Sequence, residues 1–359
     1  MARALRNELE QREHDIKIID FFESNKFETF INDKCFLFTQ RHIPKLYEKI
    51  WLNERKRDPE KRYSCSLQGQ IKKVKSNILE KINNYAPDAI ICTHFYASAL
   101  INNLIKENLI SGIKTYTILT DYCVHPYWEC SYLVDYAFIP HSSVKADLIS
   151  KGFKENQLIE TGIPVHNKFF NKIDKLDARN KVGLSDKFTI LILLGGLGLS
   201  NPKPVLKSLA KIKDLVNVVV VCGRNKKMFN QLSRFVKKNH LESFKIYGFV
   251  DFIDTLMDAS DITISRGGAT SITESLYKNL PIVFREKLYI NEKLNEELFI
   301  KNNFGIKLEK DSKADELVLK LINEPQILEN ILKSQKECNK LNTPKIIAEH
   351  IEKQNKKHE

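Results

Sequence analysis

The stretch Ile262-Thr-Ile-Ser-Arg-Gly-Gly-Ala-Thr-Ser-Ile-Thr-Glu274 predicts a buried strand, a turn of two glycines and the start of a helix. Isoleucines alternate with small polar residues, and Gly267 and Gly268 allow backbone conformations that are closed to other residues. Thr270 or Ser271 is expected to cap the helix. Because a helix start presents free N–H groups and the positive end of its dipole, the stretch predicts a diphosphate site.

The same stretch also suggests which kind of diphosphate would bind. Glu274 lies about one turn into the expected helix, where its carboxylate can accept hydrogen bonds from two ribose hydroxyls. A nucleoside diphosphate is therefore the predicted ligand. An ordinary connection between a strand and a helix would have similar residues, so the prediction depends on the rest of the chain.

The chain around this stretch predicts two α/β domains. A length of 359 residues suits two domains, each with its own core. β-rich runs alternate with helical stretches such as 71–84 and 97–107, which is typical of doubly wound, mostly parallel sheets of the Rossmann type. The expected strands are residues 16–19, 89–93, 115–120 and 136–139, then 188–194, 218–222, 245–247, 262–265 and 282–284.

A turn-rich segment separates the two series of strands. Residues 162–170 contain glycine and proline and are followed by charged residues, so we place the boundary near residue 167. The predicted domains are residues 1–166 and 167–359. After Gly305 the chain is expected to be helical to its end.

Composition indicates a cytoplasmic protein. The chain has 42% hydrophobic residues but no apolar run long enough to cross a bilayer, and it opens on a charged amphipathic stretch where a signal peptide would be apolar. Its seven cysteines contain no Cys-x-x-Cys pair and are expected to be reduced thiols. Neither an Asp-x-Asp motif nor a His/Cys cluster indicates a metal, and we expect no cofactor.

Much of the net charge of +12 lies in one segment. Residues 41–75 contain eleven Lys or Arg against four Asp or Glu, a net charge of +7, with aromatic residues between them. This combination predicts contact with an anionic membrane surface through Arg41, Lys45, Trp51, Arg55, Lys56 and Arg57. A solvated helix face with its aromatics in the core is the alternative. No nucleic-acid recognition motif accompanies the charge, so we expect no nucleic acid partner.

Three further turns follow predicted strands of the second domain. They are Leu194-Gly-Gly-Leu-Gly-Leu-Ser200, Val221-Cys-Gly-Arg-Asn225 and Tyr247-Gly-Phe-Val-Asp251. Each alone is compatible with a structural turn. Together they lie at the carboxyl ends of successive strands, where open α/β sheets bind their ligands.

These turns, and the segment Tyr289-Ile-Asn-Glu-Lys-Leu-Asn295, carry a resemblance to a known family. From about Pro87 to Gly305 the chain resembles glycosyltransferase family 28, and within it the monogalactosyldiacylglycerol synthases and bacterial diacylglycerol glucosyltransferases. The resemblance implies two Rossmann-like domains of the GT-B type that face each other across a cleft. In similar enzymes the last helix crosses back onto the first domain.

The resemblance also implies a UDP-sugar as the donor substrate. Phe249 and Val250 match the segment whose backbone binds uracil, and Glu292 and Asn295 match residues that bind the donor sugar. Family members carry glutamine where this chain has Asn291, which leaves the identity of the sugar open. The implied donor-binding residues are Gly195, Gly196, Gly198, Gly223, Asn225, Phe249, Val250, Gly267, Gly268, Ala269, Thr270, Glu274, Glu292 and Asn295.

The first domain has its own candidate residues. Pro87-Asp-Ala-Ile-Ile-Cys-Thr-His-Phe95 and Thr120-Asp-Tyr-Cys-Val-His-Pro-Tyr-Trp128 resemble the strand ends on the acceptor side of the family. His94, Asp121 and His125 are therefore the predicted catalytic residues. An imidazole can take the proton of the acceptor hydroxyl, and a carboxylate can orient or assist it.

The function that we expect is inverting transfer of a hexose from a UDP-hexose to a lipid hydroxyl, with diacylglycerol as the lipid. The protein would act in the cytoplasm, peripherally on the membrane. Three alternatives stay open: transfer of N-acetylglucosamine to a polyprenyl-linked acceptor, a soluble UDP-sugar epimerase, and a nucleotide-sugar-binding protein without catalysis.

One element of a doubly wound domain is absent from the sequence. Such a domain normally opens with a strand and a glycine-rich turn, yet this chain opens inside the helix that would follow them. In relatives that turn carries the histidine assigned as catalytic base. Either the start has been misplaced or lost, or His94 and Asp121 take over the proton transfer. We expect the chain as given to bind UDP and to transfer sugar slowly or not at all.

Overall fold

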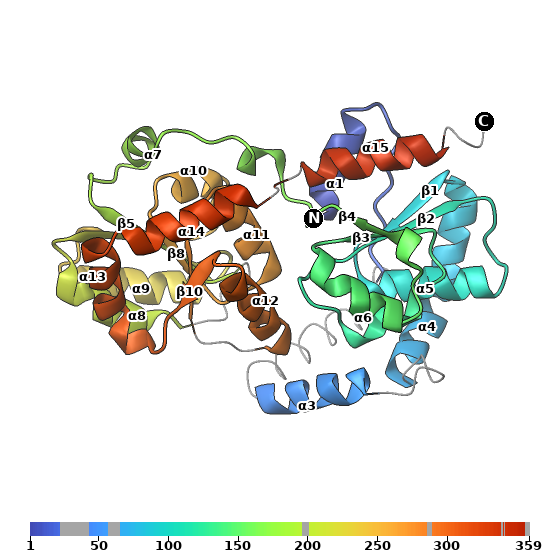
Figure 1. Cartoon of the computed structure of the whole chain (residues 1–359), viewed down its shortest axis with the longest axis horizontal. Coiled ribbons are helices and arrows are strands. Elements are labelled where there is room, and N and C mark those ends of the chain that lie inside the picture. The colour runs from blue at the N-terminus through green and yellow to red at the C-terminus, as the bar shows by residue number, and fades with distance from the viewer. Residues whose placement is uncertain are drawn as a thin grey trace. The chain divides into compact units, whose positions relative to one another are not determined.

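The chain builds two parallel β-sheets, each in a unit of its own (Figure 1). The computed structural model describes residues 1–21, 43–56, 65–195, 201–285, 289–338, 340 and 342–355. Contacts among these residues divide the chain into a first unit of Met1–His166, Tyr289–Asn291 and Leu341–Glu359, and a second unit of Asn167–Leu288 and Glu292–Lys340.

The sheet of the first unit has four parallel strands in the order β1-β2-β3-β4. The strands are β1 (Ala89–Cys92), β2 (Lys114–Ile118), β3 (Tyr136–Ile139) and β4 (Leu158–Glu160). Tyr116 and Phe138 are fully buried in its middle, and their rings stack with centroids 5.8 Å apart. Because helices cover a parallel sheet on both faces, its strands are apolar on both faces.

Different helices cover the two faces of this sheet. Alternate residues of β1 point to opposite faces, and Ile91 packs with α1 and α15, whereas Cys92 packs with α4 and α5. The helices of the first unit are α1 (Ala2–Glu10), α3 (Pro44–Arg55), α4 (Cys65–Tyr85), α5 (Phe95–Lys106), α6 (Lys145–Ser150) and α15 (Thr343–Asn355). None of the helices within the described part of the chain is both long and apolar enough to cross a membrane.

The two ends of the chain pack against each other in the first unit. Leu5 and Leu9 of α1 share a core with Ile347 and Ile351 of α15. Charge reinforces the contact, because Arg12 donates hydrogen bonds of 3.0 Å both to Glu8 and to Glu352. The C-terminal helix therefore completes the core of the first unit.

The sheet of the second unit has six parallel strands in the order β10-β9-β8-β5-β6-β7. The strands are β5 (Phe188–Leu193), β6 (Val216–Val221), β7 (Phe244–Tyr247), β8 (Ile262–Ser265), β9 (Ile282–Phe284) and β10 (Gly305–Lys307). After β5 the chain adds β6 and β7 on one side, then returns to place β8 on the other side. The strand order therefore reverses between β5 and β8.

Helices also pack on the sheet of the second unit. They are α7 (Lys175–Lys181), α8 (Lys203–Leu209), α9 (Lys226–Lys238), α10 (Ile253–Asp258), α11 (Ala269–Tyr277), α12 (Ile290–Lys301), α13 (Ala314–Asn323) and α14 (Gln326–Glu337). A buried ion pair of 2.6 Å joins α10 to the end of α11, between Asp258 and Lys278. Their side chains are only 2% and 1% exposed, so the loss of either partner would leave the other as an unpaired buried charge.

Three expectations about secondary structure were wrong. Ile16–Ile19 forms no strand, and its conformation is extended without a ladder partner. The chain after Gly305 is not wholly helical, because Gly305–Lys307 is the edge strand β10. Leu158–Glu160 is the strand β4, which the sequence did not predict. Strands of three residues give too short a pattern to be recognised, and here pairing with β3 and β9 defines them.

Candidate functional site

The carboxyl ends of the central strands of the second sheet form the first candidate site. β5 and β8 are neighbours at the point where the strand order reverses, so the loops that follow them lead to opposite sides of the sheet. The crevice between such loops is where open α/β sheets bind ligands. The loop after β5 begins at Leu194 and continues with Gly195, and the loop after β8 is Arg266–Gly268.

The loop after β8 is held against the first turn of α12. Gly267 has a φ of +92°, and a Cβ atom there would lie 2.8 Å from the carbonyl oxygen of Glu292. From the same helix, Nδ2 of Asn295 donates a 3.0 Å hydrogen bond to the carbonyl oxygen of Gly267. Both the conformation and the close contact therefore require glycine at position 267.

The helix α11 begins directly after this loop. Its first intrahelical hydrogen bond runs from the N–H of Ile272 to the carbonyl oxygen of Gly268, so the N–H groups of residues 269–271 precede the helical ladder. The predicted cap was wrong: Gly268 is the N-cap residue without a side-chain bond, and Thr270 and Ser271 lie inside the helix. Because a glycine N-cap has no side chain that could bond them, these N–H groups can bind an anion.

Arg266 is a functional candidate that the sequence reasoning missed. Its guanidinium lies 3.4 Å from the carboxylate of Glu292 in a largely buried ion pair. A Cβ atom at Gly195 would lie 3.6 Å from the same guanidinium, which therefore stands between the loops after β5 and β8. The signal was its position immediately before the two glycines, where a cation can add to the field of the helix end.

Glu274 lies one turn into α11, as predicted, and is partly buried. Burial raises the pKa of this carboxyl group to about 7, and the positive charge of Lys168 opposes the shift. Lys168 itself forms a 3.1 Å ion pair with Asp254. Glu274 is thus a carboxyl group whose ionisation changes near neutral pH, which is common for groups in binding sites.

An exposed aromatic side chain follows β7. Phe249 is 70% exposed, and the guanidinium of Arg224 lies 5.7 Å from the centre of its ring. Arg224 comes from the turn after β6, the strand next to β7. A flat aromatic ring with an adjacent guanidinium offers a surface on which a nucleobase can stack. Val250, the other predicted uracil contact, follows Phe249 and is partly buried.

Other predicted donor-binding residues have structural roles. The side chain of Asn225 accepts a 2.9 Å hydrogen bond from the N–H of Met228 and caps α9. Gly223 precedes it with a φ of +57°. Glu292 and Asn295 are buried beneath the loop after β8, so their predicted contacts with the donor sugar stay a prediction. Gly196 and Gly198 lie outside the described residues.

The two predicted catalytic histidines of the first unit are both helix caps. Nδ1 of His94 accepts a hydrogen bond of 3.3 Å from the N–H of Tyr96, and Nδ1 of His125 accepts one of 3.2 Å from the N–H of Tyr127. A neutral imidazole whose Nδ1 accepts must carry its proton on Nε2. Each ring therefore presents an N–H donor, which does not suit the predicted role of proton acceptor.

The environment of His94 reinforces this assignment. Part of the residue is exposed, but the aromatic rings of Phe95 and Tyr96 shield its imidazole from water, and this desolvation lowers its pKa to about 4. The imidazole is therefore neutral at physiological pH. A neutral imidazole can donate a hydrogen bond through Nε2 and orient an acceptor hydroxyl.

Asp121 is the remaining predicted catalytic residue. It follows β2 and is partly buried, and its Oδ2 accepts a 2.8 Å hydrogen bond from Nδ2 of Asn291, which belongs to the same unit. An ionised carboxylate is an acceptor with several lone pairs, so this bond leaves capacity for a second donor. Of the three predicted catalytic residues, Asp121 is the one suited to accept a proton.

Trp51 was predicted to contact the membrane, and this was wrong, because the side chain is 3% exposed. Its ring packs edge-on against His125, with centroids 6.2 Å apart, and so anchors α3 beside the predicted catalytic residues. Arg55 and Lys56 are exposed, and Arg55 forms a 3.1 Å ion pair with Asp147. Arg41, Arg57 and the side chain of Lys45 lie outside the described residues.

Solved structures show which known fold the chain resembles. MurG of Acinetobacter baumannii aligns with a TM-score of 0.57 at 16% identity over 80% of this chain and 79% of its own. A glycosyltransferase of Rickettsia africae aligns with a TM-score of 0.53 at 16% identity over 81% of this chain and 82% of its own. With its two parallel-sheet units, the chain has the GT-B glycosyltransferase fold.

Family models give a finer assignment. Residues 1–165 match monogalactosyldiacylglycerol (MGDG) synthase, and residues 189–356 match the glycosyltransferase family 28 C-terminal domain. Each model covers one of the two successive parts of the chain. The chain therefore belongs to glycosyltransferase family 28, with a first part of the MGDG synthase kind.

Several curated relatives are described as processive diacylglycerol beta-glucosyltransferases. The protein of Bacillus cereus strain G9842 is 29% identical over 304 residues, which are 84% of this chain and 76% of that protein. The protein of Bacillus subtilis strain 168 is 28% identical over 277 residues, which are 77% of this chain and 71% of that protein. The protein of B. cereus strain AH187 is 30% identical over 230 residues, and the chain spans 58% of the length of that relative.

The contact at Gly267 generates a prediction. Gly267→Ala should lower the affinity for UDP by at least about tenfold, because the new methyl group must displace the first turn of α12 and the residue must keep a positive φ, at a cost of about 1–3 kcal/mol. Calorimetric titration measures the affinity. Gly268→Ala is the matched control, since its φ is −62° and its Cβ would lie 3.8 Å from the nearest atom, the carboxylate of Glu292. Equal effects of the two substitutions would contradict the role of the contact.

Proposed function

We propose that the protein transfers glucose from UDP-glucose to the hydroxyl group of diacylglycerol, with inversion at the anomeric carbon. The observation that carries this proposal is the loop Arg266–Gly268 with the free end of α11, at the point where the strand order of the second sheet reverses. Support for the sugar and the lipid comes from the description shared by the relatives.

The donor is bound by the second unit in this proposal. The diphosphate lies against the N–H groups of residues 269–271, beside the guanidinium of Arg266. The uracil ring stacks on Phe249 next to Arg224, and Glu274 accepts hydrogen bonds from the ribose hydroxyls. As the bond between the sugar and UDP breaks, the helix end and Arg266 stabilise the charge that develops on the leaving phosphate.

The acceptor reacts through groups of the first unit in this proposal. The carboxylate of Asp121 takes the proton of the diacylglycerol hydroxyl. The acceptor oxygen forms a bond to the anomeric carbon on the face opposite to UDP, the bond to the β-phosphate oxygen breaks, and UDP leaves. His94 and His125 donate hydrogen bonds from Nε2 and orient the acceptor.

We also propose that α3 brings the protein to the membrane. Ile43, at its N-cap, and Leu46 and Ile50 within the helix follow a helical spacing and are 42%, 43% and 50% exposed. The buried Trp51 fixes this helix against His125. The exposed cations Arg55 and Lys56 lie at its end and are attracted to anionic lipids.

The pKa of Glu274 leads to a prediction about pH. Only the ionised carboxylate accepts two hydroxyl donors, and the pKa is raised to about 7. The affinity for UDP should therefore rise as the pH increases through 7 and fall by roughly tenfold between pH 8 and pH 6. Titration calorimetry across this range measures it. Glu274→Gln is the control. Its affinity for UDP should change with pH only as far as the phosphate of UDP itself titrates, because glutamine does not ionise.

Transfer itself tests the proposed function. With vesicles that contain diacylglycerol, labelled UDP-glucose should give a labelled glycolipid, at the slow rate expected of the chain as given, and labelled UDP-galactose should give much less. Asp121→Asn should lower kcat by roughly 10²–10⁴-fold. Glu155→Gln removes an exposed carboxylate of the same unit and should have no effect. Labelled sugar in water-soluble products alone, or full activity of Asp121→Asn, would refute the assignment.

Vesicle binding tests the role of α3. The double variant Leu46→Ser/Ile50→Ser should bind anionic vesicles at least about tenfold more weakly, because each apolar side chain contributes up to about 1.5–3 kcal/mol when it is buried in the interface. Sedimentation with vesicles measures this. Leu176→Ser/Leu215→Ser, which changes two side chains 52% and 54% exposed in the second unit, is the control. Equal losses in both double variants would show that α3 has no special role.

A further inference from the structure

The second unit contains a cavity of about 700 Å³ that is lined by none of the predicted donor-binding residues. Phe188 begins β5, Asp261 precedes β8 and Pro281 precedes β9, and all three line the cavity. The cavity therefore lies at the amino ends of these strands, whereas the loops of the donor site follow their carboxyl ends. Leu321 of α13 and Leu332 of α14 add apolar walls. Its size suits a small-molecule ligand.

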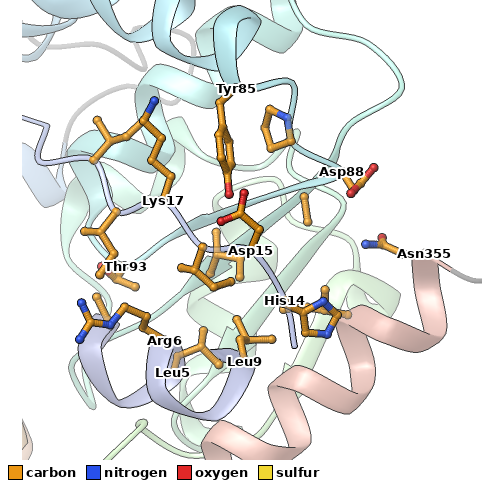
Figure 2. Close-up of a pocket in the computed structure, with 18 of the residues that line it drawn as sticks. Leu5, Arg6, Leu9, His14, Asp15, Lys17, Tyr85, Asp88, Thr93 and Asn355 are labelled. Atoms are coloured by element: carbon orange, nitrogen blue, oxygen red, sulfur yellow. The ribbon is translucent and has the colours of Figure 1, made fainter. Parts of the chain in front are cut away.

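A smaller cavity, of about 370 Å³, lies beside β1 in the first unit (Figure 2). Two cations of its lining already have partners. Arg6 forms a 3.4 Å ion pair with Glu10, and Nζ of Lys17 lies 5.3 Å from the centre of the Tyr85 ring. The cavity of the second unit differs from it in the state of its lysines.

The lysines that line the cavity of the second unit are Lys172, Lys175, Lys278 and Lys336. Two of them have carboxylate partners. Asp261 pairs with Lys175, and Asp258 pairs with Lys278, each at 2.6 Å. The other two form no ion pair with any residue that the structure describes, so they bring positive charge that is not balanced by a direct partner.

The remaining carboxylates of the lining, Asp174 and Glu329, leave this charge in place. Asp174 caps α7, since its Oδ1 accepts hydrogen bonds from the N–H groups of Leu176 and Asp177. Glu329 lies on α14 two turns before Lys336 and is exposed, so solvent screens its charge. One part of the cavity lining is therefore positive.

The lysines of the cavity are close enough to act on one another. Desolvation lowers the pKa of Lys172, and the charges of the other three lysines lower it further, against the opposing charge of Asp258. Burial, with the charges of Lys172 and Lys336, also lowers the pKa of Lys340 to about 8. Nζ of Lys340 donates a hydrogen bond to Asn279, another residue of the lining. A bound anion would reduce this repulsion.

The lining also contains a buried hydrogen-bond acceptor. Oδ2 of Asp258 accepts hydrogen bonds from Nζ of Lys278 and from the N–H of Ile173. Oδ1 of Asp258 is buried and has no hydrogen-bond partner in the described part of the chain. Because buried polar atoms are normally paired, this oxygen calls for a donor, and a hydroxyl group of a ligand can be that donor.

We propose that this cavity binds a hydroxylated phosphate ester of about the size of a hexose monophosphate, at a site separate from the donor loops. Two lysines without partners, Lys172 and Lys336, suit the double charge of a phosphate monoester better than the single charge of a carboxylate. A ligand hydroxyl donates to Oδ1 of Asp258, and Leu321 and Leu332 cover the carbon skeleton. The inference goes beyond the proposed transferase function, because it uses no residue assigned to that function.

Calorimetric titration with glucose 6-phosphate tests the site. UDP is present in excess throughout, so that the phosphate does not bind at the end of α11. The chain should bind one equivalent, and Lys172→Gln/Lys336→Gln should weaken the binding at least about tenfold, because two charge-assisted contacts are lost. Lys237→Gln/Lys238→Gln removes the same charge from an exposed part of α9 and should leave the affinity unchanged.

Two further ligands test the chemistry of the site. Inorganic phosphate should bind roughly tenfold more weakly than glucose 6-phosphate, because it lacks the sugar hydroxyls, and glucose should show no binding. No binding of glucose 6-phosphate at millimolar concentration, or equal affinities of the two double variants, would show that the cavity is not such a site. Inorganic phosphate that binds as tightly as glucose 6-phosphate would exclude the contact with Asp258 and overturn the assigned class of ligand.

Discussion

The donor side of this protein depends on one close contact, between the backbone of Gly267 and the first turn of α12. A side chain at position 267 would collide with the carbonyl oxygen of Glu292, and Asn295 binds the carbonyl oxygen of Gly267 from beneath. The loop is thereby fixed in a conformation that only glycine adopts easily.

The charged groups around this loop suit a ligand that is both anionic and hydroxylated. The positive end of α11 and the guanidinium of Arg266 favour an anion, and the carboxylate of Glu292 pairs with Arg266 at 3.4 Å. Glu274 adds a carboxyl group deeper in the same helix, where burial raises its pKa. A diphosphate with an attached ribose satisfies both features at once, whereas a simple anion would leave Glu274 without a function.

The first unit uses its side chains differently. In both His94 and His125, Nδ1 accepts the hydrogen bond of a helix cap. This bond fixes the orientation of the ring and places the proton on Nε2. The capping bonds therefore leave each ring with an N–H donor on Nε2, and the role of Asp121 as the proton acceptor stays a prediction. Trp51 is buried against His125, so it connects the exposed apolar residues of α3 to the same group of side chains.

The sequence by itself determined the class of fold and predicted where the donor binds. Alternating strands and helices, and glycines after successive strands, suffice for this because backbone geometry and strand direction are local properties that fix where loops lie on a parallel sheet. The roles of single side chains were decided only by the tertiary structure. Arg266 was missed, Trp51 was predicted to contact a membrane, and two histidines were predicted to take a proton. In each case the deciding partner, Glu292, His125 or a backbone N–H of a particular helix start, is brought into contact by folding and has no signature in the local sequence.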